Sequence, residues 1–291
     1  ALPAPSRPVR REWLAAGLRE VAAAGVTTVA TAPIDAAGIA LLDEPVHRNI
    51  GDHLIHLGIE QFFRENGMHI VARAHTYSYH HRWLGRRISH DTVIVCNGGG
   101  HLGDLYPAHQ DLREQLVRDF PLHRIVVLPQ SLYFRDDRGL QKAAEIFRSH
   151  PDFHLFLRDH DSLQRVGALG LDRVYLAPDM AHALYPVRLP RRVAAPLNGV
   201  LYLLRRDTEF TDDGLVAHGI DDIRDWPDIV RPRDTAALAS LAVAFRLLRS
   251  VGPPRALDIL LDQRRTTMIQ RAVALLAEYD EIVTSRLHGA L

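Results

Sequence analysis

Arginine and histidine side chains stand at the ends of several apolar segments of this 291-residue chain. They are Arg158 after FHLFL, Arg205 and Arg206 after VLYLL, and Arg286 and His288 after the last apolar segment. Guanidinium groups bind phosphate and carboxylate through paired hydrogen bonds, and imidazoles add a hydrogen bond or a proton. If these groups converge, they form a site for a small anion that carries both phosphate and carboxylate.

Two further residues have the chemistry for proton transfer at such a site. Asp52, in NIGDHL, stands at the start of an expected helix. It either caps that helix or faces the site, where it would accept a proton or orient a sugar hydroxyl. His101, in NGGGHLGDLY, has an ordinary pKa near neutrality, which suits acid–base catalysis. Because the chain has 17 histidines, a structural role for this one is the alternative.

Uncharged polar groups accompany these residues. Three consecutive glycines, Gly98, Gly99 and Gly100, are expected where the backbone closely approaches a ligand or another segment. They lack the Lys-Ser/Thr ending of a Walker loop and the spacing of a dinucleotide motif. Side chains suited to sugar hydroxyls or a phosphate edge are supplied by Asn49, Gln130 and Ser131.

Several polar residues have structural readings as alternatives. Arg158 and Asp159 would pair with each other, and Asp161 or Ser162 would cap the next helix. Asp179 is predicted to cap a further helix. These capping roles disfavour a metal site in the Asp-His-Asp segment, and we expect no metal. The aromatic and basic segment His75–Arg87 forms either part of an acceptor surface or a solvated loop.

Composition restricts the class of protein. A hydrophobic fraction of 47%, a charged fraction of 24% and a formal net charge of +0 predict a globular protein without general attraction to nucleic acid or membranes. A single cysteine, Cys96, excludes an internal disulfide and a thiolate metal cluster. With no apolar run near the ~20 residues of a membrane span and no secretory leader, we expect a cytoplasmic protein. The chain begins with Ala1 rather than Met and stops directly after a motif, so we expect a trimmed sequence.

The elements that position these residues are predicted to be alternating strands and helices. Apolar strands are expected at Ile39–Asp43 and in HIVARA, TVIVCN, RIVVLPQ, FHLFLRD and RVYLAPD. Being apolar on both faces, they are typical of a parallel sheet covered by helices, in which ligands bind beyond the carboxyl ends of strands. Helices are expected at Arg11–Gly25 and Asn49–Gly67, with Gly67 as a C-cap.

A second series of elements follows a proline- and arginine-rich connection at Tyr185–Gly199. It comprises a strand from Val200, helices at about Asp234–Val251 and Pro254–Tyr279, and a last strand around Ile282. We therefore predict an α/β protein with two domains, residues 1–190 and 191–291, and a site between them.

The order of the motifs NIGDHL, NGGGHLGDLY, LPQSLYF, FLRDHDSL, YLAPDMA and VTSRLHGAL resembles that of the polysaccharide pyruvyl transferases. The resemblance extends from about Asn49 to the end of the chain. It implies two Rossmann-like domains in a GT-B-like glycosyltransferase architecture, with the active site in the interdomain cleft. The N-terminal domain would be the acceptor side and the C-terminal domain the donor side. Family members commonly continue beyond this point, so the second domain is expected to be truncated.

The resemblance also implies an activity: transfer of the pyruvyl group of phosphoenolpyruvate to two hydroxyls of a hexose, giving a pyruvate ketal and phosphate without a cofactor. The acceptor would belong to a bacterial exopolysaccharide or cell-envelope glycan, or to its lipid-linked precursor. That acceptor would place the protein in the cytoplasm or, through peripheral association, at the inner face of the cytoplasmic membrane. The alternatives are a GT-B sugar-nucleotide-dependent glycosyltransferase and a non-catalytic protein of polysaccharide assembly.

The family's essential Asp, His and Arg positions fall here on Asp52, His101, Arg158, Arg286 and His288. In this scheme Arg158, Arg205 and Arg286 bind the donor. His288 holds the leaving phosphate or protonates the alkene, and Asp52 or His101 is the base that activates the acceptor. The acceptor or loop positions are Asn49, the three glycines, Gln130 and Ser131.

Overall fold

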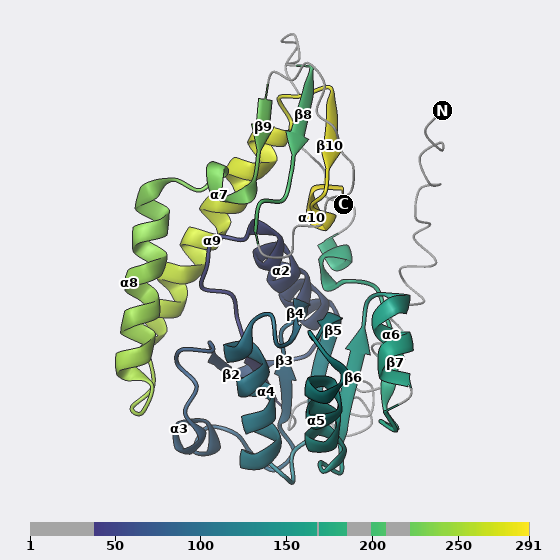
Figure 1. The fold of residues 1–291 in the computed structure, drawn as a ribbon. Coiled ribbons are helices and arrows are strands. Elements are labelled where there is room, and N and C mark those ends of the chain that lie inside the picture. Colours follow the sequence, from purple (N-terminus) through teal and green to yellow (C-terminus); the bar gives the residue numbers. More distant parts are fainter. Residues whose placement is uncertain (1–37, 168, 185–198, 208–221, 291) are drawn as a thin grey trace.

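The computed structural model of this chain describes residues 38–167, 169–184, 199–207 and 222–290 (Figure 1). The predicted helix Arg11–Gly25 lies outside the described residues, and so does the predicted connection Tyr185–Gly199 apart from its last residue. The remaining elements can be compared with the predictions one by one.

Within the described residues, seven strands form one parallel sheet in the order β2-β1-β3-β5-β6-β7, with β4 paired to β5. The strands are β1 (Ile39–Leu42), β2 (Ile70–Ala74), β3 (Val93–Cys96), β4 (Gly99–Gly103), β5 (Ile125–Tyr133), β6 (Phe153–Leu157) and β7 (Val174–Leu176). The six predicted apolar strands are confirmed. Strand β4 was not predicted, because its glycine-rich sequence has no apolar pattern and pairs with β5 through its backbone.

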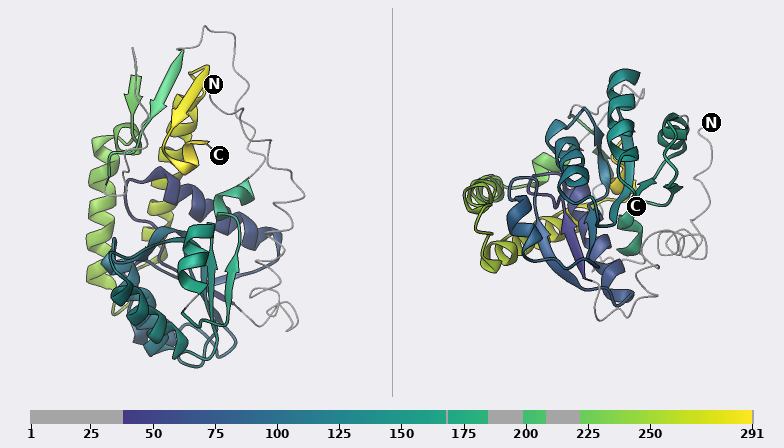
Figure 2. Two further views of the ribbon diagram at one scale, coloured as in Figure 1. Left: turned by 45° about the vertical axis from the view of Figure 1, so that its right-hand side comes forward. Right: turned by 90° about the horizontal axis from the view of Figure 1, so that it is seen from below.

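Helices cover both faces of this sheet (Figure 2). One face is covered by α3 (His81–Gly85), α4 (Pro107–Asp119), α5 (Asp137–Arg148) and α6 (His160–Gly167). The other is covered by α2 (Ile50–Glu65) and the 3₁₀ helix η2 (Met180–Leu184). Neighbouring strand residues alternate between the two cores, Leu42 joining one and Leu41 the other, which explains strands that are apolar on both sides.

A second, smaller sheet is built from residues of the C-terminal part. Its described strands are β8 (Val200–Leu203), β9 (Asp222–Arg224) and β10 (Glu281–Thr284), paired in parallel in the order β10-β8-β9. They are accompanied by α7 (Trp226–Ile229), α8 (Pro232–Leu248), α9 (Arg255–Leu276) and α10 (Leu287–Ala290). The two long predicted helices are thus confirmed as α8 and α9, each ending three residues earlier than predicted.

Helix α2 lies between the two sheets (Figure 1). Its residues Ile55 and Ile59 pack in the core of the larger sheet, whereas Ile50 packs in a third core with Leu203 and the helices α7 to α9. The fold is therefore α/β with parallel sheets, as predicted. Its division into two domains of GT-B type remains a proposal.

The segment His75–Arg87 is not a solvated loop. Tyr79, Trp83 and Leu84 are buried in the core of the larger sheet, and Tyr77 is the exposed aromatic residue of the segment. The loop alternative failed because the helix α3 is too short for an apolar period to show in the sequence. The acceptor-surface alternative stays a prediction.

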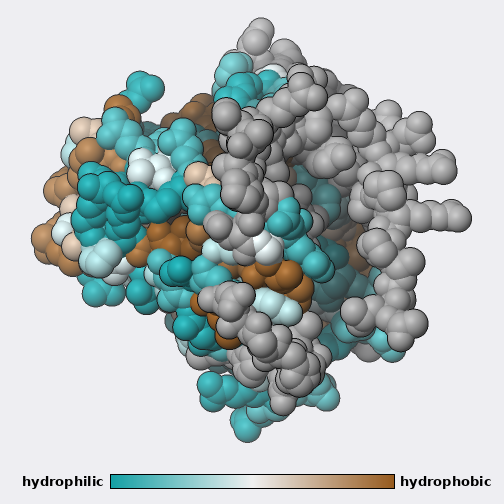
Figure 3. Space-filling view, turned by 90° about the horizontal axis from the view of Figure 1, so that it is seen from above, coloured by the Kyte–Doolittle hydropathy of each residue, from teal (hydrophilic) through white to brown (hydrophobic). Residues whose placement is uncertain are grey.

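The surface mixes polar and apolar areas. Figure 3 shows hydrophobic patches among hydrophilic ones toward the side on which α8 lies, where Val243 and Leu247 are exposed. No helix among the described residues combines the length and the apolar character needed to span a bilayer.

Candidate active site

A cavity of about 320 Å³ opens between the two sheets, where strands of both end. The larger sheet and α2 contribute Asp52, His101 and Arg158 to its wall, and the smaller sheet contributes Arg205, Arg286 and His288. Asn49 and Gly100 also line it. The structure thus brings to one place the arginines, histidines and carboxylate that the sequence placed at separate strand ends, except Arg206, which lines a neighbouring pocket.

Arg158 is held by two partners at the end of β6. Its Nη1 donates to Asp179 Oδ2 at 2.6 Å, and its Nε donates to Ser131 Oγ at 2.8 Å. The alternative in which Arg158 pairs with Asp159 is therefore wrong, because Asp179 is the carboxylate that the guanidinium reaches. Asp159 instead accepts from the Ser162 backbone N–H at 2.7 Å, so it caps α6 in place of the predicted Asp161 or Ser162.

His288 comes from the opposite side of the cavity and reaches the same carboxylate. Its Nε2 lies 3.2 Å from Asp179 Oδ1. Asp179 Oδ1 also accepts from the Ala181 backbone N–H at 2.8 Å, so the predicted capping role is confirmed for η2. The Asp179 carboxylate therefore joins a helix cap to two cavity-lining basic side chains, Arg158 and His288.

Arg286 is fixed by carboxylates of the smaller sheet. Its Nε and Nη2 donate to the two oxygens of Asp225, both at 2.8 Å, and its Nη1 donates to Asp207 Oδ2 at 2.7 Å. Arg205 Nε lies 2.9 Å from the other oxygen of Asp207. Asp225 is buried, and its backbone and side chain form a capping box at the start of α7. The guanidinium is consequently oriented by a rigid helix terminus.

Asp52 lies in the first turn of α2, but it is not the N-cap. Asn49 is the cap, because its Oδ1 accepts from the Gly51 backbone N–H at 3.1 Å. Asn49 Nδ2 also donates to Asp52 Oδ2 at 2.8 Å, and His47 Nε2 lies 3.5 Å from the same oxygen. The reading of Asp52 as a cap and nothing more is therefore wrong, and its carboxylate faces the cavity.

Gly99 provides the space in which Asp52 and His101 approach each other. Its φ is +142°, and a Cβ there would stand 2.8 Å from His101 Nε2 and 3.6 Å from Asp52 Oδ1. At Gly98 a Cβ would stand 2.9 Å from the Pro129 carbonyl oxygen of the adjacent strand β5. Gly99 thus leaves room for the side chains of His101 and Asp52, and Gly98 leaves room for the backbone of β5.

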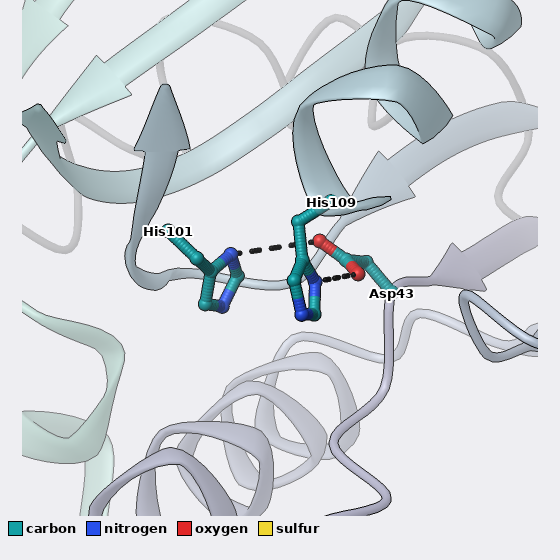
Figure 4. Close-up of side chains that lie close together, drawn as sticks. All are labelled: Asp43, His101 and His109. Atoms are coloured by element: carbon teal, nitrogen blue, oxygen red, sulfur yellow. Dashed lines mark hydrogen bonds and ion pairs between the residues drawn. The ribbon is translucent and has the colours of Figure 1, made fainter. Parts of the chain in front are cut away.

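His101 belongs to a buried polar cluster with Asp43 and His109 (Figure 4). Arg113, which is fully buried, donates to His101 Nδ1 at 2.8 Å and to Asp43 Oδ2 at 2.7 Å. Burial keeps the pKa of His101 well below its usual value, so the ring is neutral. Because Nδ1 accepts from Arg113, the ring proton is on Nε2.

Asp43 anchors this cluster at the end of β1. Its Oδ1 accepts from His109 Nδ1 at 2.6 Å and from Thr76 Oγ1 at 2.8 Å. Burial opposes its ionisation, but His109 and Arg113 outweigh burial and hold the pKa of the carboxyl below its usual value. Among the described residues, Asp43 is the non-glycine residue with positive φ, 65°. Such strain is typical of functional sites.

The ligand atoms of Asp43, His101 and His109 lie within 4.8 Å of one another, close enough to hold a metal ion. The sequence did not suggest this group, because its members come from three separate segments. In the structure, however, Asp43 Oδ2 and His101 Nδ1 already accept hydrogen bonds from Arg113. A metal ion would have to displace that guanidinium, so the residues fit a metal poorly.

Comparison with known proteins identifies the family. The family profile of polysaccharide pyruvyl transferases matches residues 49–291. The chain belongs to the polysaccharide pyruvyl transferase family. It is accordingly a transferase, and its family membership supports a role in polysaccharide pyruvylation.

The chain is similar to EpsO of Bacillus subtilis, which is assigned as a pyruvyl transferase. The two are 34% identical over 252 residues, which are 86% of this chain and 76% of EpsO. It is also similar to pyruvyl transferase 1 of Schizosaccharomyces pombe, with 30% identity over 86% of this chain and 62% of the yeast protein.

Some predicted site residues do not line the cavity. Gln130 is buried, accepts from the His101 backbone N–H at 3.2 Å and donates to the Asn97 carbonyl at 2.7 Å. The Ser131 hydroxyl accepts a hydrogen bond from Arg158 Nε at 2.8 Å. These residues, with Gly98 and Gly99, support the wall of the cavity and are not part of its lining.

Other lining residues of the cavity were not predicted individually from the sequence. They are His47, Tyr77, Tyr106, His109, Asp207 and Leu287. His47 stands two residues before the NIGDHL motif, and Tyr106 ends NGGGHLGDLY, so proximity to a motif was the available signal. Tyr77, on the loop after β2, lies in the aromatic segment His75–Arg87, which the sequence offered as part of an acceptor surface without singling out this residue.

Proposed function

We propose that this protein transfers the pyruvyl group of phosphoenolpyruvate to two hydroxyls of a hexose in a polysaccharide or its lipid-linked precursor. The products are a cyclic pyruvate ketal and free phosphate. One observation carries this proposal: Arg158, Arg286 and His288, from different sheets, line one cavity in a member of the pyruvyl transferase family. The donor is a small anion with a phosphate and a carboxylate, and these cationic groups suit both.

The donor would lie between two groups of basic side chains. Arg158 and His288 form one group, joined by Asp179, and Arg205 and Arg286 form the other, joined by Asp207. Two separate groups, each with at least one guanidinium, match a donor with two separate anionic groups. Each charge-assisted hydrogen bond in such a site stabilises the complex by about 1.5–3 kcal/mol.

The reaction requires one proton donor and acceptors for two protons. Protonation of the methylene carbon creates an oxocarbenium-like centre, which the first hydroxyl attacks. The bond between the attacked carbon and its phosphate oxygen then breaks, and phosphate leaves with the electron pair, so that the attacked carbon becomes oxocarbenium-like again. The second hydroxyl then closes the ketal. One of the two hydroxyl protons ends on the released phosphate. The other returns to the catalytic acid and replaces the proton that it gave to the methylene carbon.

Asp52 is the residue we propose as the base for the acceptor hydroxyl. Its Oδ2 accepts from Asn49, and its Oδ1 lies on the side of Gly99 and His101. His101 is unsuited to the role of base, because its neutral ring carries the proton on Nε2, beside Gly99. We propose instead that His101 donates a hydrogen bond to a substrate oxygen. His288 would hold the leaving phosphate or protonate the alkene.

The proposal extends to the setting of the reaction. It includes the two-domain GT-B architecture, with residues 1–190 on the acceptor side and 191–291 on the donor side. It also includes a cytoplasmic location, with the inner face of the cytoplasmic membrane as the place where a lipid-linked acceptor is met. No cofactor enters the proposed reaction.

The test is incubation of the protein with phosphoenolpyruvate and a panel of free, synthetic and lipid-linked hexosides. We expect phosphate release and a mass gain that corresponds to one pyruvyl ketal on an acceptor. Parallel incubations with sugar nucleotides test the glycosyltransferase alternative through release of nucleoside diphosphate. Nucleoside diphosphate release without ketal formation would refute the proposal.

A further inference from the structure

Asp179 contacts cavity-lining residues from both sheets. Oδ2 accepts from Arg158, at the end of β6 in the larger sheet, at 2.6 Å. Oδ1 lies 3.2 Å from Nε2 of His288, in α10 behind β10 of the smaller sheet. The carboxylate is 3% exposed, so these contacts are made away from bulk water.

The charge state of Asp179 follows from these neighbours. Burial disfavours the ionised form, but His288 and Arg158 outweigh burial and hold the pKa of Asp179 below its usual value. The Ala181 backbone N–H contributes in the same direction through its hydrogen bond to Oδ1. The residue is therefore a carboxylate at neutral pH, and it can accept hydrogen bonds but not donate them.

We propose that Asp179 is a positioning residue for pyruvyl transfer, whose carboxylate fixes Arg158 and His288 at one point of the cavity and so couples the two sheets there. This inference rests on the proposed function, because that function assigns Arg158 and His288 to the donor. Asp179 itself is absent from the cavity lining, so it acts through these two residues.

The contact also selects the nitrogen of His288 that faces other groups. Because a carboxylate accepts only, the proton of His288 in this contact is on Nε2. Nδ1 is then the nitrogen that remains for a ligand. It lies beside the first turn of α2, 2.8 Å from the point at which a Cβ on Gly51 would stand. An anionic oxygen of phosphoenolpyruvate held by His288 would therefore be bound by Nδ1 in its protonated form, near Asn49, the N-cap of α2.

The first test is Asp179→Asn. The amide oxygen can still accept from the Ala181 N–H and from His288, but an NH₂ group replaces the oxygen that accepts from Arg158. Two outcomes can be told apart by calorimetric binding of phosphoenolpyruvate. Loss of a negative charge alone would tighten binding of an anion, whereas loss of positioning weakens it, and we expect about tenfold weakening.

Two further variants separate positioning from charge and from folding. Ser131→Ala removes the other partner of Arg158, the hydroxyl 2.8 Å from Nε, without changing any charge, and should also weaken binding several-fold. Asp179→Glu restores a carboxylate and should bind more tightly than Asp179→Asn. In turnover assays we expect Asp179→Asn to lower kcat by about 10²-fold, the cost of misplaced reacting groups.

Asp152 offers a matched control at the opposite end of β6. It too accepts from an arginine, Arg124 Nε at 2.9 Å, and contacts a histidine, His154 Nε2 at 2.8 Å, but outside the cavity. Asp152→Asn should leave donor binding and kcat unchanged. Equal effects of the Asp152 and Asp179 variants would mean that the contact serves stability only, and the inference would fall.

A ligand-free crystal structure of Asp179→Asn makes the inference testable independently of the donor. We expect the Arg158 guanidinium to move away from the side chain of residue 179. Unchanged positions of both side chains, or binding of phosphoenolpyruvate as tight as in the parent protein, would overturn the inference. Failure of the parent protein to form a ketal would count against the proposed function alone.

Discussion

At the scale of single residues, carboxylates hold cavity-lining guanidiniums in place. Arg158 is held by Asp179, and Arg286 by the buried Asp225 and the half-buried Asp207. A buried carboxylate such as Asp225 orients the guanidinium. A carboxylate on the cavity wall, such as Asp207, competes with an incoming anion for the same guanidinium. We therefore expect Asp207 to yield its contact with Arg286 when the donor binds, whereas Asp225 keeps the guanidinium in place.

The role of His101 can be decided by two substitutions. If the neutral ring donates from Nε2, His101→Gln should retain activity, because its amide N–H can occupy a similar position. His101→Ala should lose about 10- to 100-fold in kcat/KM, the effect of one buried hydrogen-bond donor. The comparison is made by steady-state assays of ketal formation. Equal and near-complete loss in both variants would instead identify His101 as a general acid or base.

At the scale of elements, helix α2 positions a large part of the site. Its N-cap Asn49 orients Asp52, and its first turn provides the surface against which His288 packs. Gly51 makes that packing possible, because a Cβ there would meet His288 Nδ1 at 2.8 Å. The glycine of the NIGDHL motif therefore serves the contact between α2 and α10 rather than flexibility of a turn.

Gly51→Ala should separate stability from activity. Alanine favours a helix over glycine by up to about 1 kcal/mol, so the thermal midpoint should not fall greatly. The methyl group should displace His288 and lower kcat/KM by at least about tenfold. Gly85→Ala in α3 is the control, because its Cβ would meet only Phe120 Cε1 at 3.9 Å. Full activity of Gly51→Ala would show that the position of His288 is not critical.

At the scale of the whole molecule, a buried ionic network joins the two parts of the chain. Glu44, after β1, accepts from Arg73 at 2.9 Å and from Arg265 of α9 at 3.5 Å. His56 Nε2 lies 3.4 Å from the same carboxylate. The network lies where α2 packs against α9, so it holds the helices of the smaller sheet against the larger one.

Because of this network, we expect the folded protein to lose stability at acid pH. Burial by itself would raise the pKa of Glu44. The nearby His56, Arg73 and Arg265 have the larger effect, and together they lower the pKa to about 2, from the 4.5 of an unperturbed glutamate. Its ionic contribution to stability is therefore present above about pH 4.5 and is lost as the pH falls toward 2. Glu44→Gln should destabilise the protein by about 3–5 kcal/mol at pH 7, because it leaves buried cations unpaired.

Urea denaturation of both proteins at pH 7 and at pH 3 measures this effect. The difference in unfolding free energy between parent and Glu44→Gln should shrink at pH 3. A matched control is Asp91→Asn, since Asp91 is exposed and contacts only His90 in the described ion pairs. A constant difference between parent and Glu44→Gln at the two pH values would contradict the predicted ionic contribution.

The sequence by itself determined the α/β class, six of the seven described strands of the larger sheet, the helices α8 and α9 and the motif residues of the site. Apolar runs of strand length and long helical periods are local patterns, so they can be read without tertiary contacts. The order of six short motifs likewise carried the family resemblance. Strand β4 and the short helix α3 escaped this reading because backbone pairing of glycines and a helix of five residues leave no period.

Only the tertiary structure decided which polar groups meet. Asp179 pairs with Arg158 and His288, 21 and 109 residues away, and no spacing in the chain indicates those partners. The same holds for the cluster of Asp43, His101, His109 and Arg113, and for the link between Glu44 and Arg265. Local sequence sets periodicity, but the partners of a buried charge are set by the packing that removes it from water.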